Sequence, residues 1–429
     1  MDYPLFLVPY IGGGWLIGAN AILHVVIAHC AIGGGLLIVV TEALALRRND
    51  QLWLDFARRQ SGVLVLLSSV LGALTGVGIW FTIGLVHSAA TALLIHNFVW
   101  GWAIEWVFFA VEMSAALLYL ATWDRLPRRT HLAVGWLYVV AAYLSLVVIN
   151  GILSFMLTPG RWLETRGFWE GFFNPTYWPS LVLRTGIACM LAGVFGWLGA
   201  SRLAADSERR RLVRYLSAWS VAGAVLFLAG TAMWLIALPG DVQDMIVGTD
   251  GLLRNTAVAG LGAAALFGTL VVICGYLVPR AFGRVVAICI LLLATTVLGS
   301  YERVREGARK PFVIHGYMYS NGVLVAEVER LNREGILSKA RWAGAGLRSH
   351  PTAKGEQVFR AQCQSCHTLD GYLAIRRLVA GQDAEGIGAF LEALRGGRPG
   401  MPPIVGSPQE VQELAAYLAA VGSTIGGGR

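Results

Sequence analysis

Eight long apolar stretches are the feature that most limits how this chain can fold. They lie near residues 12–46, 61–86, 99–122, 132–155, 180–200, 218–238, 256–278 and 285–300. A helix needs about 20 apolar residues to cross the hydrocarbon core of a bilayer. Only 14% of the chain is charged and 56% is apolar, with the charges concentrated between the stretches. We therefore predict an all-α polytopic transmembrane helical bundle of about eight spans.

The loops between these stretches carry arginine unequally. One alternate set holds Arg47, Arg48, Arg58, Arg59, Arg125, Arg128, Arg129, Arg202, Arg209, Arg210, Arg211, Arg214, Arg280 and Arg284; the other holds Arg161, Arg166 and Arg254. By the positive-inside rule the first set is cytoplasmic, so both termini are expected on the periplasmic side of a bacterial inner membrane. The formal net charge of +8 arises mostly from the arginines of these loops and does not indicate nucleic-acid binding. The first stretch lacks a basic leading region and a cleavage site, so we expect it to be retained.

A Cys-x-x-Cys-His motif near the C-terminus predicts a covalent c-type haem. Cys363 and Cys366 have the spacing that takes up the two vinyl groups of one haem, and His367 is placed to ligate its iron. An amphipathic helix is expected over residues 385–395 and a closing helix over 410–421. Between them, Met401 stands in a Gly-Met-Pro-Pro run and is the expected sixth ligand, which is typical of an electron-transfer haem. We predict a periplasmic cytochrome c domain over residues 351–429.

The remaining four cysteines and most histidines lie elsewhere. The cysteines are Cys30, Cys189, Cys274 and Cys289, all in apolar stretches where a thiol behaves as a small hydrophobe, and no disulfide framework is implied. His131 reads as a cap or interface residue, and His350 falls in a linker. Residues 312–350 form an external linker segment, in which His315 and Met318 are potential soft ligands or, as the alternative, parts of a structured connection.

Ionisable side chains inside the spans are candidates for function, because burying them in lipid is costly. His24 and His29 lie in the first span, five residues apart and so not on one face; His87 and His96 lie further along. A histidine with a carboxylate from another helix could hold a b-type haem, whereas a single membrane histidine can also simply bond a backbone carbonyl. Glu105 and Glu112 are seven residues apart on one helical face, which indicates proton transfer or a haem contact.

The membrane region resembles subunit I of the cytochrome bd oxidases. The matching segments are residues 23–26 (LHVV), 103–105 (AIE) continuing to Glu112, 123–126 (WDRL), 150–151 (NG) and 306–311 (EGARKP). The resemblance implies that His24 and Glu306 ligate the two haems of the oxygen-reducing pair and that Arg309 lies beside them. It also implies that Glu105 and Glu112 line the haem pocket and its proton path, although here they are one residue closer together than in the family.

Two departures from the family pattern suggest a remodelled relative. Arg184 stands where the family has a histidine ligand of a low-spin b haem, and residues 256–262 contain no methionine to complete that site. The long outer loop that binds quinol in the family is reduced to residues 239–253. That haem is therefore expected to be missing or held by other residues, and the cytochrome c domain is expected to replace the quinol site as the point of electron entry or exit.

These inferences predict a membrane haem protein with domains at residues 1–311, 312–350 and 351–429. We expect covalent haem c together with one or two haem b, or haem d, in a bd-like terminal oxidase subunit. The expected partners are a second membrane subunit, a periplasmic c-type cytochrome or other redox protein, and lipid, with no nucleic acid. Two alternatives stay open: a non-catalytic electron conduit between the quinone pool or a partner complex and a periplasmic cytochrome, and a scaffold that lacks membrane haems.

Overall fold

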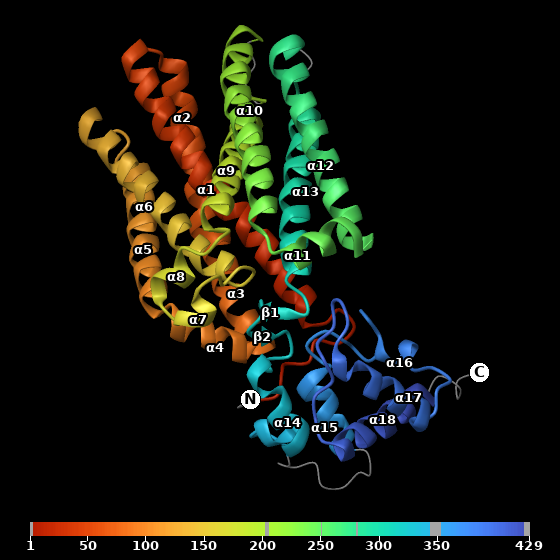
Figure 1. Cartoon of the computed structure of the whole chain (residues 1–429). Helices are drawn as coiled ribbons and strands as arrows, with labels where there is room; N and C mark the ends of the chain where they lie inside the picture. The colour runs from red at the N-terminus through yellow and green to blue at the C-terminus, as the bar shows by residue number, and fades with distance from the viewer. Residues whose placement is uncertain (1–2, 202–205, 250, 280–281, 344–352, 424–429) are drawn as a thin grey trace. The chain divides into compact units, whose positions relative to one another are not determined.

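The computed structural model describes residues 3–201, 206–249, 251–279, 282–343 and 353–423 (Figure 1). The expectations for His350, Arg202 and Arg280 therefore lie outside the described residues. Nearly all regular structure in the described part is helical, as the apolar stretches predict.

Eight helical segments of the described residues are long and apolar enough to cross a membrane, which confirms the predicted number. They are α1 (Gly13–Arg48), α2 (Gln51–Leu66) continuing through a short π-helix into α3 (Ala73–Val86), α5 (Val99–Ala121), α6 (Arg128–Phe155), α9 (Tyr177–Ala200), α10 (Asp206–Ala237), α12 (Gly251–Val272) and α13 (Arg284–Ala308). The second span begins earlier than predicted, since Asp50 accepts a hydrogen bond from the Trp53 backbone N–H and so caps the helix at Gln51.

Close backbone contact between α1 and α9 fixes the centre of the bundle. α9 is the most buried of the eight spanning segments, with 78% of its apolar window inside the protein. A Cβ atom on Gly33 of α1 would lie 1.9 Å from the carbonyl oxygen of Ala188 on α9, so only glycine allows this approach. Small residues commonly permit such packing between membrane helices, where dispersion contacts replace the hydrophobic effect.

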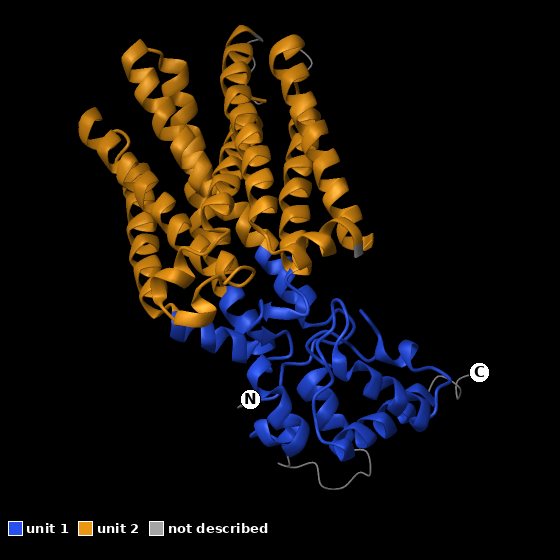
Figure 2. Ribbon diagram, in the orientation of Figure 1, with its two compact units in different colours: residues 1–21, 78–97, 309–429 blue, residues 22–77, 98–308 orange. Residues whose placement is uncertain are grey.

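The chain divides into two compact units that cut across the linear sequence (Figure 2). Unit 2 comprises Ile22–Val77 and Phe98–Ala308 and holds most of the spanning helices. Unit 1 comprises Met1–Ala21, Gly78–Asn97 and Arg309–Arg429. The N-terminal segment, the end of α3 and the short helix α4 (Ser88–Asn97) thus belong with the C-terminal part.

Unit 1 contains a small antiparallel hairpin and a separate helical core. The hairpin pairs β1 (Phe312–Ile314) with β2 (Met318–Tyr319), and a short 3₁₀ turn and α14 (Val328–Glu334) follow. In the C-terminal part, α15 (Ala353–Gln362) and α17 (Ala384–Ala393) both pack on α18 (Pro408–Ser423), with α16 (Ile375–Leu378) beside them. The last two long helices, α17 and α18, lie within a few residues of their predicted positions, and the motif of residues 363–367 follows α15.

Candidate haem sites

The Cys-x-x-Cys-His motif begins directly after α15. The Cys363 backbone N–H donates to the Phe359 carbonyl at 2.8 Å, and the His367 N–H donates to the Cys363 carbonyl at 2.9 Å, so the five residues form a compact turn. Both cysteines are free thiols. Burial raises the pKa of Cys363 to about 12, with Cys366 adding to the effect, so this thiol stays protonated. The turn holds two thiols and an imidazole together as covalent haem attachment requires.

His367 is oriented with one ring nitrogen available to a metal. Its Nδ1 lies 2.9 Å from the carbonyl oxygen of Leu373, and because a carbonyl only accepts, Nδ1 carries the proton. Nε2 therefore keeps its lone pair. Burial lowers the pKa of His367, and the nearby Lys310 lowers it further, so the ring is held neutral as a ligand must be.

Met401 stands on a turn that folds back onto the same core. Its N–H donates to the Arg398 carbonyl at 3.0 Å, and Gly400 has a φ of +78°, which a residue with a side chain rarely adopts. The Met401 side chain packs against the hydrophobic cluster that includes Cys363. The domain's donor set, two thiols, one imidazole and one thioether, fits a c-type haem.

Met401→Ala is expected to lower the midpoint potential of haem c by on the order of 100 mV, because a thioether ligand stabilises reduced iron. Redox titration of the c absorption band measures this shift. The amount of covalent haem should not change, since the thiols and His367 remain. An unchanged potential and spectrum would show that Met401 is not the axial ligand.

His24 on α1 is arranged much like His367. Its Nδ1 lies 3.1 Å from the Thr75 hydroxyl oxygen, and that hydroxyl donates to the Leu71 carbonyl at 2.6 Å. Since the hydroxyl proton is already used, Nδ1 of His24 acts as the donor and Nε2 keeps a lone pair. The half-buried His24 is thus in a tautomer suited to binding iron.

Glu105 and Glu112 lie on one face of α5, as their spacing predicts. Glu105 accepts a hydrogen bond from Ser145 Oγ of α6 at 3.2 Å. Glu112 is buried and interacts electrostatically with Tyr138 of α6. The Tyr138 hydroxyl donates to the Ala31 carbonyl of α1 at 2.7 Å.

The two pairs of residues just described form two polar levels along α5 and α6. A third level, which the sequence did not reveal, follows them along the same helices. His131 Nδ1 lies 2.8 Å from Glu42 Oε1, the Tyr119 hydroxyl donates to Glu42 Oε2 at 2.6 Å, and His131 Nε2 lies 2.9 Å from the Tyr119 carbonyl. Glu42 and His131 are fully buried. Because both ring nitrogens of His131 have partners, this histidine is not available to a metal.

The three levels repeat every seven residues along both helices. On α5 the positions are Glu105, Glu112 and Tyr119; on the antiparallel α6 they are Ser145, Tyr138 and His131. Seven residues of helix rise about 10.5 Å, so the levels form a regular polar column along the α5–α6 interface. Glu42 of α1 completes its last level. A helix-pair column of this kind can carry protons between its levels if water joins them.

Glu302, rather than Glu306, is the buried carboxylate at the end of α13. Arg184 Nη2 donates to Glu302 Oε1 at 2.9 Å, and Arg305 Nε donates to Glu302 Oε2 at 3.0 Å. Glu306 is exposed, and Arg309 is buried in unit 1. The residue at the expected histidine position thus forms an ion pair, and the roles of Glu306 and Arg309 as haem contacts remain predictions.

A small cavity of about 220 Å³ adjoins this cluster within unit 2. Its lining residues are Asn150, Ser154, Leu157, Thr176, Ser180, Arg184, Trp234, Tyr301 and Arg305. Ser180 Oγ donates to Asn150 Oδ1 at 2.9 Å. By contrast, Nε of Arg184, Nη1 of Arg305 and the Tyr301 hydroxyl, all on residues that line the cavity, have no hydrogen-bond partner among the described residues.

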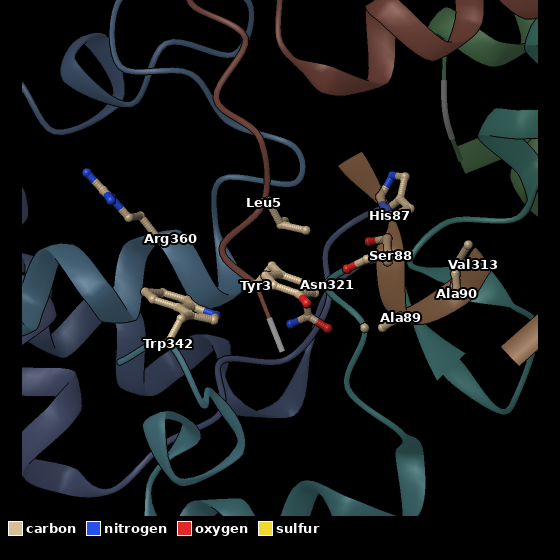
Figure 3. Close-up of a pocket in the computed structure, with 12 residues that line it drawn as sticks. Tyr3, Leu5, His87, Ser88, Ala89, Ala90, Val313, Asn321, Trp342 and Arg360 are labelled. Atoms are coloured by element: carbon tan, nitrogen blue, oxygen red, sulfur yellow. The ribbon is translucent and has the colours of Figure 1, made fainter. Parts of the chain in front are cut away.

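A larger pocket of about 420 Å³ lies within unit 1 (Figure 3). Its walls come from the N-terminal segment, α4, the hairpin region and α15, and include Tyr3, His87, Asn321, Trp342 and Arg360. Ser320, also on the wall, lies 3.9 Å from Cys366 Sγ. None of the expected haem c ligands lines this pocket, so it is a neighbour of the cytochrome c motif and not the haem c cleft itself.

Fold and ligand sets together define a membrane haem protein with an attached cytochrome c domain. The family model for cytochrome bd terminal oxidase subunit I matches residues 14–250, more than half of the chain, and the model for cytochrome c oxidase, cbb3-type, subunit III matches residues 350–418. The chain therefore belongs to the cytochrome bd terminal oxidase subunit I family and carries a C-terminal cytochrome c domain. The family assignments imply haem binding, a multi-pass membrane location and a role in electron transfer.

Two further comparisons find a relative in sequence and a relative in fold. The chain is 29% identical over 190 residues to cytochrome bd ubiquinol oxidase subunit 1 of Bacillus subtilis, a match that covers 41% of this chain and 40% of the relative. The chain thus spans well under half of that relative's length in the match. The bd oxidase structure from Geobacillus thermodenitrificans superposes with a TM-score of 0.62 at 15% identity, covering 72% of this chain and 88% of the other, and this likeness supports the fold.

Proposed function

We propose that this chain is the catalytic subunit of a bd-like terminal oxidase that receives electrons through its own cytochrome c domain. The observation that carries the proposal is the joining, in one chain, of a bd-type bundle to a domain whose thiols, imidazole and thioether suit a covalent haem. The link between α10 and α12 supports it. That link consists of residues 238–250, with α11 (Gly240–Asp244) and a π-helical turn, Met245–Thr249, in its described part. It is much shorter than the quinol-binding loop expected for the family.

The chain's own residues have separate tasks in this proposal. His24 would hold one membrane haem through Nε2, with Thr75 fixing the orientation of its ring. Glu306 and Arg309 would contact a second membrane haem. Haem, when bound, supplies the redox-active iron at which oxygen can be reduced. Glu105 and Glu112 would deliver protons, because each lies at a level of the α5–α6 column. Tyr119, His131 and Glu42 would form the cytoplasmic end of that column under the arginine-based orientation.

The proposed topology sets the expected partners. With both termini in the periplasm, the cytochrome c domain would meet a soluble c-type cytochrome or another redox protein there. Subunit I of this family normally works with a second membrane subunit, and we propose that this chain does the same. The exposed apolar side chains of α5, among them Trp100, Trp106 and Val107, leave surface for lipid or for such a subunit.

A pyridine haemochrome assay with a reduced-plus-carbon-monoxide difference spectrum tests the proposal. An oxidase should contain covalent haem c and non-covalent haem that binds carbon monoxide, since oxygen reduction needs an open coordination site. Non-covalent haem that ignores carbon monoxide would instead establish an electron conduit. Haem c alone would make the membrane bundle a scaffold.

Glu112→Gln is expected to lower the rate of oxygen reduction by about 100-fold or more, since a positioned proton donor typically contributes that much. Glutamine keeps the volume and hydrogen bonding of the side chain but cannot carry a proton. Oxygen uptake with reduced cytochrome c as donor measures the rate. Haem content should stay at the wild-type level; a variant with full activity would remove Glu112 from the proton route.

A further inference from the structure

Three buried nitrogen atoms near Glu302 have no hydrogen-bond partner among the described residues: Nε2 of His29, Nε of Arg184 and Nη1 of Arg305. The buried hydroxyl of Tyr301, beside Glu302, has none either. His29 and Arg184 are each only 2% exposed. An unpaired buried polar group destabilises the folded protein, and a charged one does so more strongly. Three such groups in one region call for a common explanation.

The ring of His29 is set up to donate an electron pair. Its Nδ1 lies 2.8 Å from the carbonyl oxygen of Val25, one turn earlier on α1. Because that oxygen can only accept, Nδ1 carries the proton and Nε2 presents a lone pair. A backbone carbonyl on Nδ1 with a free Nε2 is the usual arrangement of a metal-binding histidine.

Packing places His29 beside Arg184. α1 and α9 touch at Gly33 and Ala188, and they run in the same direction because three spans separate them. His29 and Arg184 each come four residues, about one turn, before that contact, so they lie at the same level of the bundle. His29 also interacts electrostatically with Arg184 and Glu302, which agrees with this placement.

The two guanidinium groups near Glu302 keep unused N–H groups, although Glu306 also interacts electrostatically with Arg305. Glu302 pairs with both guanidinium groups, at 2.9 Å and 3.0 Å. Each guanidinium still has an N–H to donate, and such groups prefer carboxylates or phosphates. A single ligand can satisfy all three atoms if it offers an electron-pair acceptor to the imidazole and carboxylate oxygens to the arginines. Haem offers both, as iron and as propionates.

We propose that His29 ligates a membrane haem and that Arg184 and Arg305 bind its propionates. This proposal rests on the proposed function in that it needs a haem within the bundle. It assigns a ligand at a position that the resemblance did not mark, and it explains how Arg184 can stand at the expected histidine position without loss of the site. The axial ligand would have moved from α9 to α1.

The test is the ratio of non-covalent to covalent haem in the purified full chain. Each chain is expected to carry one covalent haem c, so the amount of haem c gives the number of chains and no separate protein assay is needed. His29→Leu should lose about one non-covalent haem per chain together with its electron paramagnetic resonance signal. In His29→Gly, added imidazole should restore both. Cys30→Ala, a buried neighbour on α1, is the packing control and should keep the wild-type ratio.

The arginine variants report on the propionates. Arg305→Gln should weaken haem retention by about 10-fold or more without changing the spin state of the iron, whereas Arg303→Gln, at the exposed position two residues earlier, should have no effect. An unchanged haem ratio and resonance signal in folded His29→Leu, or no response of His29→Gly to imidazole, would overturn the proposal. A wild-type chain that binds haem c alone would instead overturn the proposed function from which it starts.

Discussion

Replacing Cys363 and Cys366 together by serine is expected to remove all covalently bound haem from the chain. The two thioether bonds are the only covalent link that the motif provides, and serine cannot form them. Haem-dependent peroxidase staining after denaturing electrophoresis should fall to background. Oxygen uptake driven by reduced cytochrome c should fall equally far, because we propose that electrons enter through this domain.

The same variant separates the two haem compartments. Non-covalent haem in the bundle should remain and should still be reduced by dithionite, since its expected ligands His24 and His29 lie in unit 2. Cys289→Ser is the matched control, because this exposed cysteine lies in α13 and outside the motif. Covalent haem that persists in the double variant would disprove the assignment of the motif. Undiminished oxygen uptake without haem c would show that electrons enter elsewhere.

The sequence predicted the features that depend on local pattern. Span number follows from apolar length, and the haem c motif from the fixed spacing of Cys363, Cys366 and His367. The common face of Glu105 and Glu112 follows from their separation of seven. Each of these needs only one helix or one turn, so no tertiary information is required.

What the sequence could not give was the partner of each buried charge. In the sequence, Glu42 lies close to Arg47 and Arg48 at the end of the first span, where a carboxylate can also face solvent. Its bonds to His131 and Tyr119 join residues far apart in the chain. The unused Nε2 of His29 and the pairing of Arg184 with Glu302 likewise depend on how α1, α9 and α13 pack. Helical periodicity identifies a face, but not what that face meets.

His131→Leu is expected to lower the free energy of unfolding by about 3–5 kcal/mol, the usual cost of removing one partner from a buried ion pair. The change would leave the Glu42 carboxylate inside the bundle with only the Tyr119 hydroxyl as a partner, while the His131 ring would also leave its stack on Tyr119 at 4.3 Å between centroids. Equilibrium unfolding in mixed detergent micelles, followed by circular dichroism, measures the loss. His96→Ala, at an exposed position, should change stability by no more than about 0.5 kcal/mol.

A double-mutant cycle with Glu42→Gln decides whether the stability lost in His131→Leu comes from the unpaired charge of the Glu42 carboxylate. Glutamine can still accept the Tyr119 hydrogen bond but carries no charge. If the penalty of His131→Leu is the uncompensated carboxylate, adding Glu42→Gln should recover a large part of it, with a coupling energy of about 1–3 kcal/mol. Additive losses would mean that the histidine contributes through packing alone. In that case the Glu42–His131 level would be a structural joint between α1, α5 and α6, and the proton column would have to begin at Glu112.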